Sequence, residues 1–390
     1  DETTRGAAAE IYPEVAPAIV VVRTPLGHGT GFFVDAEGWV VTNHHVIEQT
    51  LVDPQMGAQL AVIYAGRMRG GAMSLNERTE MGSGTVPPTG ECCTAAPPIL
   101  EFDPEGNLMN AWGGESTDEY TWPASNHGIT VDANDNIWIG GNGAGDGHIL
   151  KFTRDGQFLA QFGMPGEDLG SNQTEHFGRP AKISFNMTSD EAYVSDGYRN
   201  KRVAVLDATT GEVKRYWGAY GNTPSDENTG RYDPNAELID QFRTPVHCAE
   251  PAEDGLVYVC DRPNDRIQVF QTDGTYVDEV RIAPATLGDG STWDIAFSRD
   301  PEQTYMYLAD GKNMKVYIMD RQNLEVLTSF GDGGRQPGLF FAVHSIATDS
   351  QGNIFTTETY EGKRVQRFIF KGIGPIPAAN QGAPWPTTGG

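Results

Sequence analysis

The chain has 390 residues, with 47 glycines, 24 prolines and a formal net charge of −25. Such acidity argues against nucleic acid or an anionic membrane surface as a partner, because both require a positively charged footprint. No apolar run is long enough to span a bilayer. The sequence begins DETTRG without a signal-peptide pattern, so we expect any such leader to have been removed, and the acidity fits a secreted or periplasmic protein.

The first part of the chain contains short strand patterns separated by irregular segments. Residues 1–17 predict an extended arm, and AIVVVR at 18–23 predicts an apolar, β-branched strand. Two stretches, 30–43 and 51–67, each predict a strand, a turn and a second strand. A clear pair of strands follows between 99 and 112.

A repeated phrase occupies the rest of the chain, and its clearest copy is HGITVDANDNIWIG at His127–Gly140. Each copy predicts a hydrophobic strand, an Asp/Asn/Gly turn and a second strand, after which two shorter strand patterns follow. Units of four short strands that repeat every 40–65 residues are typical of β-propeller blades. We therefore expect an all-β, six-bladed β-propeller over 18–370, with an irregular first blade from 18–112 and later blades at about 127–163, 180–218, 246–282, 293–331 and 344–370.

The last expected blade lacks a fourth strand, because the sequence after Phe370 is a Pro/Gly-rich tail over 371–390. A propeller closes its ring or leaves exposed strand edges. We therefore expect the N-terminal strand at 18–23 to pair with this blade. The two ends of the chain are also candidates for contact with a protein partner or with further copies of the chain.

Three copies of the phrase open with a histidine, and in each an aromatic residue follows 11 positions later. The histidines are His127, His247 and His344. They lie on alternate blades at equal register, so we expect them to converge on the central axis as three imidazole ligands for one zinc ion with an open fourth position. The alternative is that they are polar residues lining a wet channel. The remaining two copies open with Lys182 and Asp294.

The four cysteines leave the redox compartment open. Cys248 and Cys260 lie on two strands of one predicted hairpin, where a disulfide is geometrically allowed but not required. Cys92 and Cys93 lie in a Pro-rich segment as either a vicinal disulfide or two thiols.

These repeats resemble NHL repeats, and the span 98–370 resembles the peptidyl-α-hydroxyglycine α-amidating lyase family, which has a six-bladed propeller. The resemblance implies that the three histidines bind catalytic zinc, that Tyr198 in VSDGYRNKR is a site tyrosine and that Arg266 in NDRIQVF is a site arginine. It also implies a lyase that cleaves a carbinolamide into an amide and glyoxylate, and it admits a structural calcium ion.

Two departures from the family pattern concern the substrate more than the metal. The family has a further arginine in its first blade; here its place is taken by His45 or Arg67, or the arginine is missing. The residue after the last zinc ligand is acidic in the family but is Ser345 here. Arg202, Arg266 and Arg364 also recur at one blade position, which favours a structural role in pairing with blade Asp residues.

Residues 23–46 resemble the start of a trypsin-fold periplasmic serine protease, with His45 at the place of the catalytic base. A working triad needs an Asp and a Ser in a G-[ND]-S-G-G setting, which the sequence lacks. We therefore expect no peptidase activity from this segment.

The sequence thus favours a zinc-dependent lyase or hydrolase on a small hydroxylated or carboxylate-bearing substrate, which could also be a peptide. The alternative is a non-catalytic NHL propeller that serves as an extracellular binding or assembly subunit. Bound metal at the axis separates the two readings.

Overall fold

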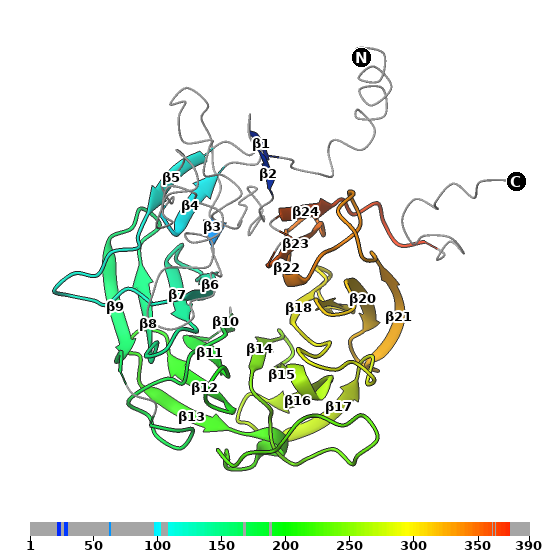
Figure 1. The fold of residues 1–390 in the computed structure, drawn as a ribbon, viewed down its shortest axis with the longest axis horizontal. Helices are drawn as coiled ribbons and strands as arrows, with labels where there is room; N and C mark the ends of the chain where they lie inside the picture. Colours follow the sequence, from blue (N-terminus) through cyan, green and yellow to red (C-terminus); the bar gives the residue numbers. More distant parts are fainter. Residues whose placement is uncertain are drawn as a thin grey trace, which may run out of the picture.

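The chain folds as an all-β propeller, with its sheets arranged in a ring (Figure 1). The computed structural model describes residues 22–24, 27–29, 62–63, 97–102, 108–166, 169–186, 189–360, 362 and 364–374. Among these there is no helix long and apolar enough to cross a membrane.

Four sheets of the ring have four antiparallel strands each. They are formed by β6 (Asn126–Val131), β7 (Ile137–Gly141), β8 (His148–Phe152) and β9 (Phe158–Gly163); by β10 (Lys182–Asn186), β11 (Glu191–Asp196), β12 (Arg202–Asp207) and β13 (Val213–Trp217); by β14 (Val246–Pro251), β15 (Leu256–Asp261), β16 (Arg266–Gln271) and β17 (Tyr276–Arg281); and by β18 (Asp294–Phe297), β19 (Tyr305–Asp310), β20 (Lys315–Asp320) and β21 (Glu325–Phe330). A three-stranded sheet of β22 (Val343–Thr348), β23 (Ile354–Glu358) and β24 (Arg364–Phe368) continues the series.

These sheets make five blades in the described part of the chain, and not the six expected from the sequence. Where the first blade is expected, the structure has a smaller sheet of β3 (Val62–Ile63), β4 (Ile99–Phe102) and β5 (Leu108–Trp112). Most of 18–112 lies outside the described residues, as do Arg67, His45 and the cysteines at 92 and 93.

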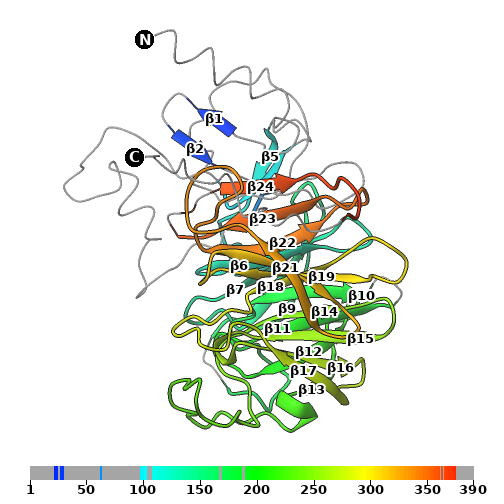
Figure 2. The same cartoon turned by 90° about the vertical axis from the view of Figure 1, so that its right-hand side faces the viewer.

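The expected closure of the ring by the strand at 18–23 is not confirmed. The described strand β1 (Val22–Thr24) pairs with β2 (Gly27–Gly29), whereas β24 pairs with β23. Figures 1 and 2 both place the β1–β2 pair at the margin of the ring, close to β24. The arm at 1–17 and most of the tail at 371–390 lie outside the described residues.

Alternation of apolar and small side chains in the middle strands produces the core between blades. The aromatic residues of the repeated phrase, Trp138, Tyr258 and Phe355, are all buried. Tyr258 packs in a cluster with Ile295 and Met306 of the next blade. Each interface between blades is thus filled by side chains from several strands, and the first strands also line the cavity along the axis.

Charged pairs at the blade ends confirm the structural role expected for the recurring arginines. Arg202 pairs with Asp196 at 2.8 Å, and both side chains are fully buried. Arg266 pairs with Asp261 at 2.7 Å in the same way. Buried charges of this kind are stable only when paired and hydrogen-bonded.

Candidate metal centre

The three phrase-opening histidines converge on the axis, as the sequence predicts. His127, His247 and His344 are the second residues of β6, β14 and β22, are buried, and offer nitrogen atoms that all lie within 4.8 Å of one another. Three nitrogens bound to a tetrahedral zinc at about 2.1 Å would lie about 3.4 Å apart. A small inward movement of the rings would therefore bring all three to one ion.

A local break in strand pairing accompanies each histidine. The register of β14 against β15 shifts between Val246 and Cys248, and that of β22 against β23 shifts between Val343 and Ser345, so that His247 and His344 have no partner in these ladders. In β6 the shift lies between His127 and Ile129. Such bulges redirect side chains next to functional sites.

Glycine 128 makes the bulge in β6. Its φ is +31°, and a Cβ there would lie 2.2 Å from the carbonyl oxygen of Ala181. Any side chain would therefore push the strand that carries His127 away from the neighbouring blade.

Backbone carbonyls set the tautomer of two of the three histidines. His127 Nδ1 lies 2.6 Å from the carbonyl oxygen of Ala181, and His247 Nδ1 lies 2.5 Å from that of Trp293. A carbonyl can only accept, so each Nδ1 carries the proton and each Nε2 presents a lone pair. His344 Nδ1 instead lies 3.0 Å from the hydroxyl of Ser345.

Burial keeps His247 and His344 neutral. It holds the pKa of His247 well below the usual value, and the neighbouring Arg262, His344 and His127 lower it further. Burial, together with the charges of His127 and Arg262, also holds the pKa of His344 well below the usual value. Neutral imidazoles are the form that binds a metal.

Tyr198 lies over the histidines, as the family resemblance implies. Its hydroxyl is 3.0 Å from His127 Nε2 and 3.1 Å from His247 Nε2. Since both nitrogens accept, the hydroxyl donates to one of them at a time. Gly197 makes this placement possible, because a Cβ there would lie 1.9 Å from the carbonyl oxygen of Val246.

The arginine beside Tyr198 is Arg262, which the sequence interpretation missed. It begins the short helix η6 (Arg262–Asn264), and its Nη1 lies 3.4 Å from the Tyr198 hydroxyl. Its guanidinium stacks on Trp293 at 4.5 Å and lies 3.9 Å from Asp289. The buried Nε has no hydrogen-bond partner among the described residues, so the group retains donors for a ligand.

Arg266, the arginine taken from the family motif, lies elsewhere. Its guanidinium contacts Asp261, Tyr220, Glu279 and two backbone carbonyls, none of which belongs to the histidine cluster. An alignment of the turns after the second strands would have pointed to Arg262 instead. Tyr198 lies two residues after the Asp that ends β11, and Arg262 lies one residue after the Asp that ends β15.

Trp293 completes the surroundings of the histidines. Its ring centroid is 5.9 Å from that of His247 and 5.5 Å from that of His344. Its indole nitrogen donates to the carbonyl oxygen of Gly290 at 2.7 Å, which fixes the ring.

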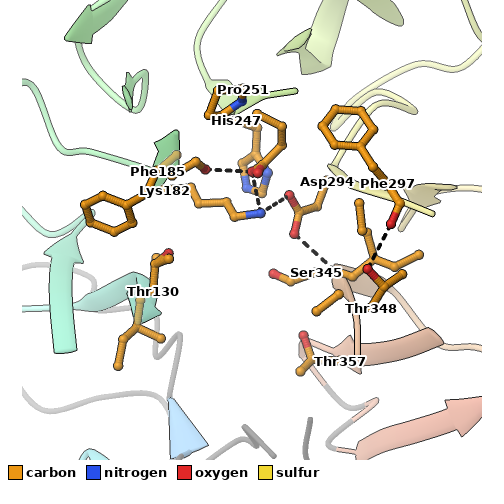
Figure 3. A pocket seen from close by; sticks show the side chains of 18 of the residues that line it. Thr130, Lys182, Phe185, His247, Pro251, Asp294, Phe297, Ser345, Thr348 and Thr357 are labelled. Atoms are coloured by element: carbon orange, nitrogen blue, oxygen red, sulfur yellow. Dashed lines mark hydrogen bonds and ion pairs between the residues drawn. The ribbon is translucent and has the colours of Figure 1, made fainter. Parts of the chain in front are cut away.

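A cavity of about 320 Å³ runs along the first strands of the blades from the histidines (Figure 3). Within it, the Lys182 ammonium lies 2.6 Å from Glu250 and 2.7 Å from Asp294. Glu250 and Asp294 thus share the charge of one lysine. The structural calcium that the sequence analysis admits stays a prediction.

A disulfide joins Cys248 and Cys260, which face each other across β14 and β15. It lies one residue after His247 and two residues before Arg262. The bond therefore ties the strand that carries His247 to the strand that leads to Arg262.

Comparison with known proteins identifies two groups of homologues. The chain is 27% identical over 241 residues to human NHL repeat-containing protein 3, which covers 60% of this chain and 58% of that protein. It is 21% identical over 366 residues to peptidyl-α-hydroxyglycine α-amidating lyase 1 of Drosophila melanogaster, which covers 90% of this chain and 62% of that protein. The chain thus spans less than two thirds of the length of these curated relatives.

No family model matches the chain. Among solved structures, a streptogramin B lyase superposes with a TM-score of 0.47 at 11% identity, over 90% of this chain and 96% of that chain. A likeness of this size carries no argument about function. The resemblance of 23–46 to a serine protease finds no support among the relatives named here.

Proposed function

We propose that the chain is a zinc-dependent lyase whose substrate is a small molecule or peptide end that carries a hydroxyl beside a carboxylate. The class is that of a peptidyl-α-hydroxyglycine, the substrate in the name of the Drosophila relative. The observation that carries this proposal is the combination of three converging histidines with Tyr198 and Arg262 directly beside them.

The donor set fits zinc. Three imidazoles that leave a fourth position for substrate or water are a common catalytic arrangement for this ion. When bound, zinc would act as a Lewis acid that stabilises a developing alkoxide or carbonyl oxygen.

The residues of the chain would supply the remaining chemistry. Cleavage of a carbinolamide breaks the C–N bond while the hydroxyl carbon becomes a carbonyl, so the hydroxyl loses a proton and the amide nitrogen gains one. The Tyr198 hydroxyl, already in hydrogen-bond contact with two histidines, is suited to transfer that proton. The free donors of Arg262 would bind the carboxylate.

An oxidising compartment is part of the proposal. The buried disulfide between Cys248 and Cys260 supports a periplasmic or secreted location, because such bonds persist where thiols are not kept reduced.

The test combines metal analysis with turnover. We expect the purified protein to contain about one zinc per chain, and we expect it to release glyoxylate from a synthetic peptidyl-α-hydroxyglycine. Removing a charge-assisted contact costs about 1.5–3 kcal/mol, so Arg262→Met should lower kcat/KM at least about tenfold, mainly through KM. Tyr198→Phe should lower kcat instead.

Arg281→Met and Tyr276→Phe serve as matched controls, since both residues belong to β17, outside the cluster. Protein that binds no zinc and releases no glyoxylate would overturn the proposal. That result would favour a binding or assembly module.

A further inference from the structure

The two first strands that lack a histidine meet in an ion pair across the cavity. Lys182 begins β10 and Asp294 begins β18. The Lys182 Nζ lies 2.7 Å from Asp294 Oδ1 (Figure 3), although the two residues are 112 positions apart in the chain. The side chains are 19% and 2% exposed, so the pair is largely shielded from water.

Each member of this pair directly follows a carbonyl that orients a metal-binding histidine. Ala181, whose oxygen accepts from His127 Nδ1, precedes Lys182. Trp293, whose oxygen accepts from His247 Nδ1, precedes Asp294. The blades without a histidine thus supply the backbone carbonyls that orient the imidazole rings of His127 and His247 in the neighbouring blades.

Asp294 also reaches the strand of the third histidine. Its Oδ2 accepts a hydrogen bond of 3.1 Å from the backbone nitrogen of Ile346, two residues after His344. One carboxylate therefore links β10, through Lys182, to β22. Glu250 of β14 joins through its contact with the same ammonium.

We infer that Lys182 and Asp294 are positioning residues for the three histidines, and that their ion pair holds the surrounding blades at the spacing one metal ion requires. This inference rests on the proposed zinc site. Burial alone would lower the pKa of Lys182, but the facing Asp294 and Glu250 carboxylates raise it above its usual value, so the lysine stays charged. Removing either charge would leave the other poorly compensated.

The first measurement is the affinity for zinc. Loss of residues that orient metal ligands typically lowers affinity about 10–100-fold, and we expect a loss in this range for Lys182→Met and Asp294→Asn. Lys182→Arg keeps the charge and should recover most of the affinity. The matched control is Lys151→Met, which breaks a comparably shielded pair with Asp132 in β6–β9, 3.2 Å apart.

The second measurement needs no metal. The nitrogen chemical shifts of His127 and His247 in the metal-free protein report whether Nδ1 carries the proton. We expect a single Nδ1-protonated form in the wild type and in Lys151→Met, and mixed forms in Lys182→Met. Asp294→Asn, which nearly preserves volume, provides a second variant should Lys182→Met fail to fold.

The results separate the two proposals. Wild-type protein that binds no zinc would overturn the proposed function, while the histidine shifts would still decide the positioning role. Wild-type protein that binds zinc, with Lys182→Met and Asp294→Asn binding it within twofold and showing unchanged shifts, would overturn the positioning role alone.

Discussion

The blades β14–β17 and β22–β24 each carry one of the three converging histidines at the same register, yet they hold it in different ways. His247 starts a four-stranded blade, donates to a backbone carbonyl and precedes a disulfide. His344 starts a three-stranded blade and contacts a neighbouring hydroxyl. The pair Cys248–Cys260 in one blade corresponds to the pair Ser345–Thr357 in the other. The repeated phrase therefore sets the place of each histidine, whereas the residues that support it differ between copies of the phrase.

The largest expected difference between the two blades concerns their buried ion pairs. Arg266 and Asp261 are both fully buried, whereas Arg364, which pairs with Glu358, is 13% exposed. Arg266→Met should reduce the free energy of unfolding by about 3–5 kcal/mol, because it leaves a buried carboxylate unpaired. Arg364→Met should cost less, since water can reach the site. Urea unfolding followed by circular dichroism measures both, and equal losses would contradict this difference.

The next effect concerns the disulfide. Replacing both cysteines, Cys248→Ala with Cys260→Ala, should reduce the free energy of unfolding by about 3 kcal/mol, the value expected for a loop of this length. The reverse change, Ser345→Cys with Thr357→Cys, should stabilise the last blade if the bond forms. Denaturant midpoints with and without reductant measure each. A double cysteine variant that forms the bond without gaining stability would show that the last blade is already as constrained as its counterpart.

A smaller effect is expected at the hydroxyl beside His344. Ser345→Ala removes the Nδ1 partner of this histidine and should lower zinc affinity about tenfold. Cys248→Ala with Cys260→Ala leaves the carbonyl partner of His247 in place, so its effect on affinity should be smaller than its effect on stability. Competition with a chromophoric chelator measures both affinities. If Ser345→Ala binds zinc as tightly as the wild type, the hydroxyl does not orient the ring.

The smallest effect should be alike in the two blades. The pKa values of His247 and His344 are both held well below the usual value of about 6.5. Below that pH the unfolded chain takes up protons that the metal-free native protein does not. The free energy of unfolding should therefore be unaffected by these groups above pH 6.5 and fall below it by up to about 1.4 kcal/mol per pH unit for each histidine.

His247→Ala and His344→Ala should each remove the fall in the free energy of unfolding that one histidine causes below pH 6.5. Urea titrations of the metal-free protein at pH 7.5, 6.5 and 5.5 would show it as a shallower slope than in the wild type. A slope that only one of the two variants reduces would mean that the histidines differ in protonation as well as in support.

The sequence was sufficient to predict the convergence of the three histidines, because equal spacing within a repeat implies equal height along the axis. It could not predict the bulges at Gly128, His247 and His344, which arise from strand pairing. Arg266 was selected because NDRIQVF matches an arginine motif of the lyase family, and Arg262 was not considered. That motif reflects a packing role shared by several blades, while the site arginine lies in a turn whose sequence differs from blade to blade.

The number of blades shows a second limit. Five of the units predicted from repeats have strands where expected, with small shifts at their ends. The N-terminal region contains no copy of the phrase, and its expected blade rested on short apolar runs alone. Strand patterns without a repeat do not determine which strand pairs with which.

The place of Trp293 gives the protein an internal optical reporter. Its indole lies against His247 and His344, so an ion bound by these histidines would be within a few ångströms of the ring. A paramagnetic ion such as Cu²⁺ at that distance should quench the emission of this tryptophan strongly, whereas Zn²⁺, with its filled d shell, should leave it bright. Occupancy, exchange and competition between ions could then be followed in real time without any added dye.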